Sequence, residues 1–183
     1  MAVRYKKIRS LAEQLLQQYD VLGASVPIEE MVHKHGVRIH RSPADSSLSG
    51  YLARDPSSGV AVIGVNSNQH PLRQRFTIAH EWGHLLLHKG IEVHVDHAGS
   101  MPMTLLVNLR DQQASEGTDE EEREANCFAA EILMPAAFIE KDVRQIQGLD
   151  LLDGDDSDKI RVLAEKYEVS AQAFGYRLAN LHL

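Results

Sequence analysis

The chain has 183 residues, of which 43% are hydrophobic and 25% are charged, and its formal net charge at pH 7 is -7. These values suit one globular domain with a small appendage; they exclude general disorder and argue against a protein that coats nucleic acid. No apolar run approaches the roughly 20 residues that span a bilayer, and residues 1–7 lack the apolar stretch of a secretory signal. With Cys127 as the single cysteine, the sequence predicts a soluble cytoplasmic protein with no membrane partner.

Hydrophobic spacing predicts two helices and three strands in the first third of the chain. Residues 8–19 place apolar side chains at helical intervals, and a short second helix is expected from Pro27, because proline suits a first helical turn. Alternating or β-branched residues predict strands at 37–40, 48–54 and 59–66. Residues 60–65 are almost fully apolar, and we expect this strand to bind a substrate backbone by edge addition.

The rest of the chain is predicted to be mainly helical. The strongest helix spans residues 73–88, whereas residues 90–118 lack a sustained period and are expected to form a long loop with one short strand at 105–107. Acidic residues in a first turn predict a helix from 118 or 119 that ends at Pro135. Further helices are expected at 136–146 and 158–182.

The strongest predicted helix contains the pattern H-E-x-x-H, formed by His80, Glu81 and His84. Residues four apart share one helix face, about 6 Å apart along the axis, so the two imidazoles can converge on one metal ion. Zinc binds such nitrogens, and Glu81 is placed to act as a general base toward water at the metal. At this composition chance predicts only about 0.04 such windows. The sequence therefore predicts one zinc ion per chain.

His88 continues the four-residue spacing but is not predicted to be a third histidine ligand. From His80 to His88 the helix axis spans about 12 Å, too far for one tetrahedral ion. The metzincin spacing H-E-x-x-H-x-x-G-x-x-H is also absent. We therefore expect His88 at the helix C-terminus or in the wall of the cleft.

The acidic start of the later helix is the best source of a third protein ligand. Glu122 shares an inward stripe with Asn126 and small residues, which permit close approach to the histidine helix. Glu122 is therefore predicted as the ligand, and Asn126 as the group that fixes a histidine tautomer. Glu124, which shares a face with Phe128, is the alternative ligand.

Two segments carry a family resemblance. Residues 75–88, RFTIAHEWGHLLLH, and residues 122–135, EREANCFAAEILMP, resemble the ImmA/IrrE family of zinc metallopeptidases. Residues 107–111 and the strand ending at Asn66 are also similar to family segments, so the resemblance covers roughly residues 8–140. It implies a zincin-like α+β fold of the gluzincin kind, with a small three-stranded sheet, and a glutamate ligand followed one turn later by Asp or Asn. That implication supports Glu122 and Asn126.

The resemblance also implies a function and a domain organisation. Its members are bacterial or mobile-element proteins that cleave a helix-turn-helix repressor and so switch on stress or transfer genes. This chain lacks the N-terminal helix-turn-helix domain of longer relatives, so we expect the repressor to be a separately encoded protein. The expected division is a metallopeptidase domain over 1–140 and a helical, helix-turn-helix-like extension over 141–183 packed on it.

The C-terminal stretch 162–178 resembles a helix-turn-helix, with a turn at Val169 and Ser170 between two apolar-faced helices. Residues 159–183 offer only four Lys or Arg against two acids, which argues against direct DNA binding. We expect this stretch to pack on the protease core or to dock a repressor. Cys127 and Trp82 are predicted to be buried packing residues.

The predicted chemistry is peptide hydrolysis at a zinc site of His80, His84 and Glu122, with Glu81 as the base. The partner of the oxyanion stays open among four residues: His88, His94 or His97 of the long loop, and Tyr51.

Three other functions compete with this prediction. A peptide deformylase also has H-E-x-x-H, but its third ligand is a cysteine upstream, whereas Cys127 lies downstream in a helix. A non-catalytic, zinc-stabilised regulator would bind a repressor or DNA without cutting; the intact Glu81 disfavours it. A DNA-binding regulator would use the C-terminal helices, and a salt-dependent shift assay would detect it.

Overall fold

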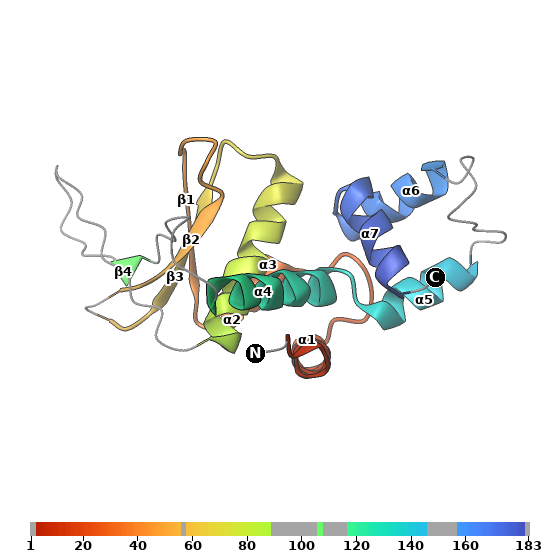
Figure 1. Ribbon diagram of the computed structural model, residues 1–183, viewed down its shortest axis with the longest axis horizontal. Helices are drawn as coiled ribbons and strands as arrows, with labels where there is room; N and C mark the ends of the chain where they lie inside the picture. Colours follow the sequence, from red (N-terminus) through yellow and green to blue (C-terminus); the bar gives the residue numbers. More distant parts are fainter. Residues whose placement is uncertain (1–2, 56–57, 89–105, 108–116, 146–156, 182–183) are drawn as a thin grey trace.

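The computed structural model describes residues 3–55, 58–88, 106–107, 117–145 and 157–181. The sheet lies at one end of the molecule, α3 and α4 cross beside it, and α6 and α7 form the other end (Figure 1). The fold is therefore α+β, as predicted. In chain order the elements are α1 (Tyr5–Gln18), α2 (Ile28–Lys34), β1 (Arg38–Ser42), β2 (Gly50–Arg54), β3 (Ala61–Asn66), α3 (Pro71–Leu87), β4 (Leu106–Val107), α4 (Gly117–Leu133), α5 (Ala136–Gln145), α6 (Ser157–Tyr167) and α7 (Ala171–Leu181).

The strands form one sheet in the order β1-β3-β2-β4. β1 runs parallel to β3, and β2 pairs antiparallel with both β3 and β4. The three predicted strands are confirmed. The sheet has one strand more than the predicted three, β4, which pairs with Ala53 and Arg54 of β2. β4 lies within the short strand expected at 105–107.

β3 is an interior strand, so the prediction that residues 60–65 bind a substrate by edge addition is wrong. Both sides of β3 are already paired, one to β1 and the other to β2, and all six of its residues are buried. A strand that is apolar on both faces is typical of the middle of a covered sheet. Apolar and polar residues do not alternate along β3, so neither of its faces suits contact with water, and the strand lies in the interior of the sheet.

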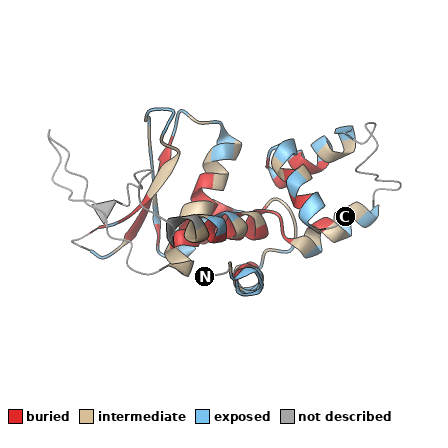
Figure 2. Ribbon diagram, in the orientation of Figure 1, coloured by how far each residue is buried: buried red, intermediate tan, exposed pale blue. Residues whose placement is uncertain are grey.

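The core forms where α3 packs on the sheet and, on its other side, crosses α4. Ile78 and Trp82 of α3 are fully buried, as are Phe128 and Ile132 of α4. The Trp82 ring meets Phe128 edge to face, with ring centroids 5.8 Å apart, so the prediction that Trp82 packs in the core is confirmed. Figure 2 shows buried residues concentrated where these helices and the sheet meet. Burial of each such side chain contributes about 1.5–3 kcal/mol, which holds the two helices together.

A buried ion pair attaches the C-terminal helices to α4. Arg177 of α7 donates to the two carboxylate oxygens of Glu131 in α4 at 3.0 and 2.6 Å, and to the carbonyl of Met134 at 3.0 Å. α5 runs across residue 140, at which the two-part division is predicted, and that division stays a prediction. Of the helices that the structure describes, none combines the length and apolar character needed to cross a membrane.

Candidate metal centre

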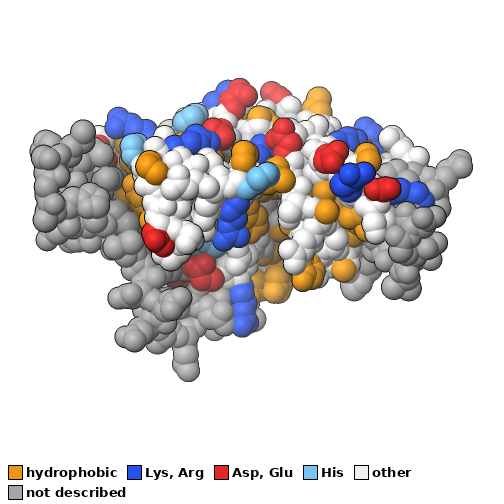
Figure 3. Space-filling model, turned by 90° about the horizontal axis from the view of Figure 1, so that it is seen from above, with side chains coloured by type: hydrophobic (Ala, Val, Ile, Leu, Met, Phe, Trp, Pro, Cys, Tyr) orange, Lys and Arg blue, Asp and Glu red, His pale blue; other side chains and the backbone are white. Residues whose placement is uncertain are grey.

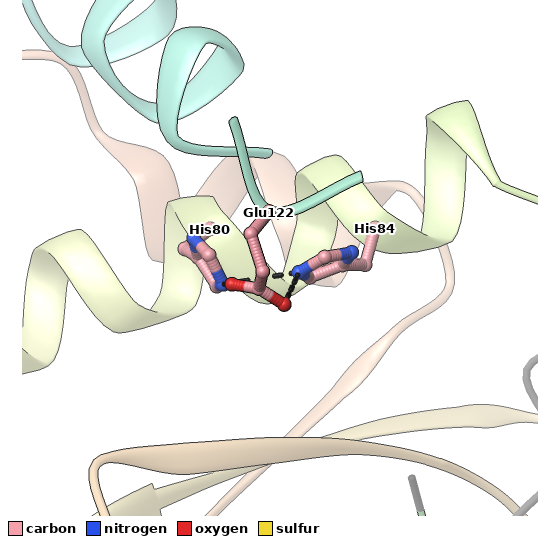
Figure 4. Close-up of side chains that lie close together, drawn as sticks. All are labelled: His80, His84 and Glu122. Atoms are coloured by element: carbon pink, nitrogen blue, oxygen red, sulfur yellow. Dashed lines mark hydrogen bonds and ion pairs between the residues drawn. The ribbon is translucent and has the colours of Figure 1, made fainter. Parts of the chain in front are cut away.

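Side chains from α3 and α4 converge on one point (Figure 4). The Nε2 atoms of His80 and His84 are 3.0 Å apart. The carboxylate oxygens of Glu122 lie 3.2 Å from His80 Nε2 and 3.3 Å from His84 Nε2. Within the described ranges, donor atoms of these three residues lie within 4.8 Å of one another, as a bound metal ion requires. Two imidazole nitrogens and one carboxylate match the donor set of catalytic zinc sites, so the residues fit such an ion.

Gly83 allows the two helices to bring these groups together. A Cβ atom at this position would lie 3.0 Å from Phe128 Cδ1 and 3.3 Å from Ala125 Cα, both on α4. Contacts that short force a neighbour to move in a close-packed interior. Because α4 also carries Glu122, the glycine inside the H-E-x-x-H pattern keeps the carboxylate close to the histidines.

The three candidate ligands differ in exposure. The side chain of His84 is 5% exposed and that of His80 is 15% exposed, whereas Glu122 is 36% exposed. The cluster is therefore closed behind His84 and open on the side of Glu122. A metal held here would have protein on one side and access for water and a substrate on the other.

Asn126 contacts the first histidine from behind. Its Oδ1 lies 3.1 Å from His80 Nδ1. An amide oxygen only accepts hydrogen bonds, so the proton of His80 sits on Nδ1 and the lone pair of Nε2 faces the cluster. In metal sites, a residue that does not itself bind the metal often orients a histidine ligand by this kind of hydrogen bond to its second ring nitrogen. Asn126 thus occupies the place that the helical stripe predicts for it.

Glu124, the alternative ligand, is directed elsewhere. It accepts hydrogen bonds from Arg4 Nε at 2.8 Å and from the Arg4 backbone N–H at 3.0 Å, and His88 Nε2 lies 3.1 Å from its Oε2. The Arg4 hydrogen bonds lower the pKa of this carboxyl to about 2. Two positions along a helix turn the side chain by about 200°, so Glu124 faces away from the point at which Glu122 meets the histidines.

His88 lies behind His84 and outside the cluster. Its Nδ1 is 3.1 Å from His84 Nδ1, the nitrogen opposite the one that faces Glu122. His88 is the first residue after α3, with extended backbone angles φ -119° and ψ 143°, and its side chain is only 4% exposed. Its place agrees with the expectation of a residue at the helix C-terminus.

The other predicted site residues are placed as follows. Glu81 follows His80 on α3 and is partly buried. A Cβ at Gly50 would meet Thr77 of α3, so the side chain of the next residue, Tyr51, points to the opposite face of β2. There its ring covers Gly64, and the structure does not bring it to the cluster. His94 and His97 lie outside the described residues.

Comparison with known proteins decides the family. A sequence model of the IrrE N-terminal-like domain, peptidase M78, matches residues 32–179. The chain belongs to this family. The resemblance read from the two sequence motifs is therefore confirmed. The match extends further toward the C-terminus than the range of roughly residues 8–140 that the motifs suggest. It includes α6 and nearly all of α7.

One solved structure supports the fold of this IrrE N-terminal-like domain. A Mycobacterium tuberculosis transcriptional regulator superimposes with a TM-score of 0.60 at 16% sequence identity, and the match covers 95% of this chain. It spans 46% of the regulator, so about half of that protein has no counterpart here. At this identity the likeness shows the fold alone. None of the curated proteins matches the chain.

Sequence reasoning missed two residues near the candidate metal centre. Phe76 stacks on the His80 ring, with centroids 6.2 Å apart and planes 28° apart. Its position four residues before His80 could have revealed it, since such residues are neighbours on a helix. Arg4 holds Glu124 from 120 residues away, and no local pattern signals a contact of that range.

A cavity of about 670 Å³ opens beside the cluster, between α1, α3, α4 and α7. Its wall includes Asn126 and Phe76, which both contact His80. Tyr5 and Tyr176, which are 61% and 67% exposed, line it as well. Helix α7 of the IrrE-like domain thus helps to shape the space next to the candidate metal centre.

Proposed function

We propose that this chain is a zinc-dependent endopeptidase of the cytoplasm that cleaves a partner regulatory protein. The observation that carries the proposal is the convergence of His80, His84 and Glu122 next to Glu81, in a family of peptidases. The partner is a separately encoded helix-turn-helix repressor, and its cleavage releases stress or mobile-element genes. Membership of the peptidase family supports the reaction class.

In this proposal each residue has a distinct task. His80, His84 and Glu122 hold one zinc ion, which when bound supplies a Lewis acid that polarises a carbonyl and acidifies water. Glu81 takes a proton from the attacking water as its oxygen bonds to the carbonyl carbon, and then gives a proton to the leaving amine nitrogen as the peptide bond breaks. Asn126 keeps His80 turned toward the cluster.

The cavity between α1, α4 and α7 receives side chains of the substrate. It adjoins the cluster through Asn126 and Phe76, and it presents two exposed tyrosines, Tyr5 and Tyr176. Aromatic side chains of this kind supply large contact area at low entropic cost. We therefore assign substrate selection to the surface shared by α7 and the metal-bearing helices.

Two measurements on the full chain test the proposal. Elemental analysis of the purified protein should find about one zinc per chain, with a clear loss in Glu122→Ala and none in Glu140→Ala, a control on a half-exposed glutamate of α5. A wild-type chain that cannot hold zinc after reconstitution would remove the peptidase proposal. Wild-type zinc that survives Glu122→Ala would move the third ligand elsewhere.

The second measurement separates cleavage from binding. The chain is incubated with a purified repressor encoded beside it, and fragments are identified by mass spectrometry. Glu81→Gln should keep zinc and lose the fragments, because an amide cannot accept the proton. A stable complex without fragments in the wild type would favour the alternative, a regulator that binds a repressor without cutting it.

A further inference from the structure

A line of hydrogen bonds runs from the N-terminal segment to the rear of His84. Arg4 donates to Glu124 from its backbone N–H at 3.0 Å and from Nε at 2.8 Å, and its Nη2 contacts the second oxygen. Glu124 Oε2 is 3.1 Å from His88 Nε2, and His88 Nδ1 is 3.1 Å from His84 Nδ1. The side chains of Glu124, His88 and His84 are only 6%, 4% and 5% exposed, so these three members of the line are screened from water.

With His88 as a neutral imidazole, the chemistry of these groups sets the direction of each hydrogen bond. An ionised carboxylate only accepts, so His88 must donate to Glu124 from Nε2. A neutral imidazole has one N–H, which leaves His88 Nδ1 as an acceptor. His84 must then donate from its own Nδ1, so its Nε2 has a lone pair that faces Glu122 and His80.

We propose that Arg4, Glu124 and His88 form a positioning relay that fixes His84 as the Nδ1–H tautomer and thereby raises its affinity for the metal. The inference rests on the proposed function, because it takes His84 as a zinc ligand. It assigns Glu124 to orientation of a ligand and gives the N-terminal segment a part in the metal centre. The neutral side chain of a free histidine in water favours the Nε2–H form, so a relay of this kind removes the form that would block binding.

The position of Arg4 explains why the relay needs the N-terminal segment. Its Nη2 also donates to the carbonyl of Leu87, the last residue of α3, at 3.3 Å. The same guanidinium therefore contacts both Glu124 and the helix end at which His88 turns out of α3. Loss of this contact should free Glu124 to rotate, while the side chain of Arg4 itself is 42% exposed and its removal leaves the core intact.

The first test reads the tautomer directly in the metal-free full chain at pH 7.5. Long-range ¹H–¹⁵N correlation spectra distinguish protonated from unprotonated ring nitrogens, and the His84→Gln variant assigns the signals. We expect the wild type to show His84 protonated at Nδ1, and His88→Phe to populate the Nε2–H form. His80, which Asn126 holds, should keep its pattern in both. A wild-type His84 that lacks a proton on Nδ1 overturns the relay, because His84 Nδ1 would then accept a hydrogen bond from an imidazolium at His88.

The second test measures zinc affinity by competition with a chromogenic chelator. His88→Phe should weaken binding by about 10–100-fold, the range for loss of an outer partner of a ligand, and Glu124→Gln and Arg4→Ala should weaken it less. Adding Arg4→Ala to His88→Phe should bring no further loss, because the relay is already broken. His40→Phe, at an exposed position of β1, is the matched control. Affinity within twofold of wild type in His88→Phe overturns the proposal.

The variants keep the inference separate from protein folding and from the proposed function. If His88→Phe does not fold, Arg4→Ala and Glu124→Gln give the tautomer ratio and the affinity instead, and an unchanged ratio in both overturns the relay. If the wild type binds no zinc, the proposed function fails, whereas the tautomer of His84 in the metal-free protein still decides the relay.

Discussion

At the scale of single residues, the two histidines of the cluster are oriented by different means. His80 contacts one neutral amide, Asn126, one turn along α4 from Glu122. His84 contacts a second histidine, which in turn contacts a charged carboxylate. The two supports come from the same helix, because α4 carries Asn126 and Glu124. Single substitutions in α4 can therefore affect one histidine without the other.

Cys127 lies next to Asn126 in α4, and its environment predicts low reactivity. The thiol is partly buried, and burial, with the nearby Glu131 carboxylate, raises its pKa from 9.0 to about 11. Only the thiolate reacts with iodoacetamide. In the folded chain at pH 8 the raised pKa leaves less thiolate, but each thiolate is more nucleophilic because its pKa is higher. We therefore expect alkylation of the folded chain to be about tenfold slower than alkylation of the chain unfolded in urea. The logarithm of the rate should still rise at pH 10.

The unfolded chain is the control for Cys127. Its alkylation rate should level off above pH 9, where an ordinary thiol is mostly ionised. If the alkylation rate of the folded chain also levels off near pH 9, burial does not raise the pKa of the Cys127 thiol.

At the scale of elements, the distance between α3 and α4 decides whether Glu122 reaches the histidines. Gly83→Ala places a Cβ 3.3 Å from the Ala125 backbone, and backbone does not yield as a flexible side chain does. We expect this variant to lose about 1–3 kcal/mol of unfolding free energy, as overpacked cores do. Its zinc affinity should fall as well, because α4 moves as a unit with Glu122. Urea unfolding and chelator competition measure the two effects.

Gly175→Ala in α7 is the matched control for the helix contact. A Cβ at Gly175 meets nothing within 4 Å, so this change should raise stability by about 0.5–1 kcal/mol, the usual gain of alanine over glycine in a helix. It should leave zinc affinity unchanged. Equal losses of zinc in both variants would contradict a specific role for the α3–α4 distance.

The sequence predicted the elements and the three clustered residues because their signals are local. His80 and His84 are one helical turn apart, and Glu122 and Asn126 lie on one stripe of a second helix. The relay could not be predicted, because Arg4 and Glu124 are 120 residues apart in the chain. The almost fully apolar composition of residues 60–65 was itself a signal for an interior strand. The expectation that a substrate binds beside this strand led instead to the wrong prediction of an edge position.

At the scale of the whole molecule, α4 joins the parts of the chain. Its N-terminal half faces α3 with Glu122, and Glu131 near its C-terminal end meets Arg177 of α7, with Arg9 of α1 at 3.4 Å. On the face shown in Figure 3, acidic and basic side chains are interspersed and no continuous basic patch is visible. The described side chains on this face therefore do not form the clustered positive charge that nucleic-acid binding needs.

The pair of Arg177 and Glu131 carries the last prediction, which concerns attachment of the C-terminal helices. Both side chains are at most 7% exposed, and removal of one partner leaves a buried charge without its counterion. We expect Arg177→Met to lower the unfolding free energy by about 3–5 kcal/mol in urea titrations. Arg161→Ala, which breaks an exposed pair with Asp158, should change it by less than about 1 kcal/mol.

The double variant Arg177→Met with Glu131→Leu separates the charge from the packing. Replacement of both buried ions by apolar groups of similar size is often neutral or stabilising, so most of the loss in Arg177→Met should be recovered. If the loss persists in full, the role of Arg177 lies in its contact with the carbonyl of Met134. A loss below about 1 kcal/mol in Arg177→Met itself would mean that α7 is held to α4 by its apolar side chains, Phe174 and Leu178, with no net contribution from the ion pair.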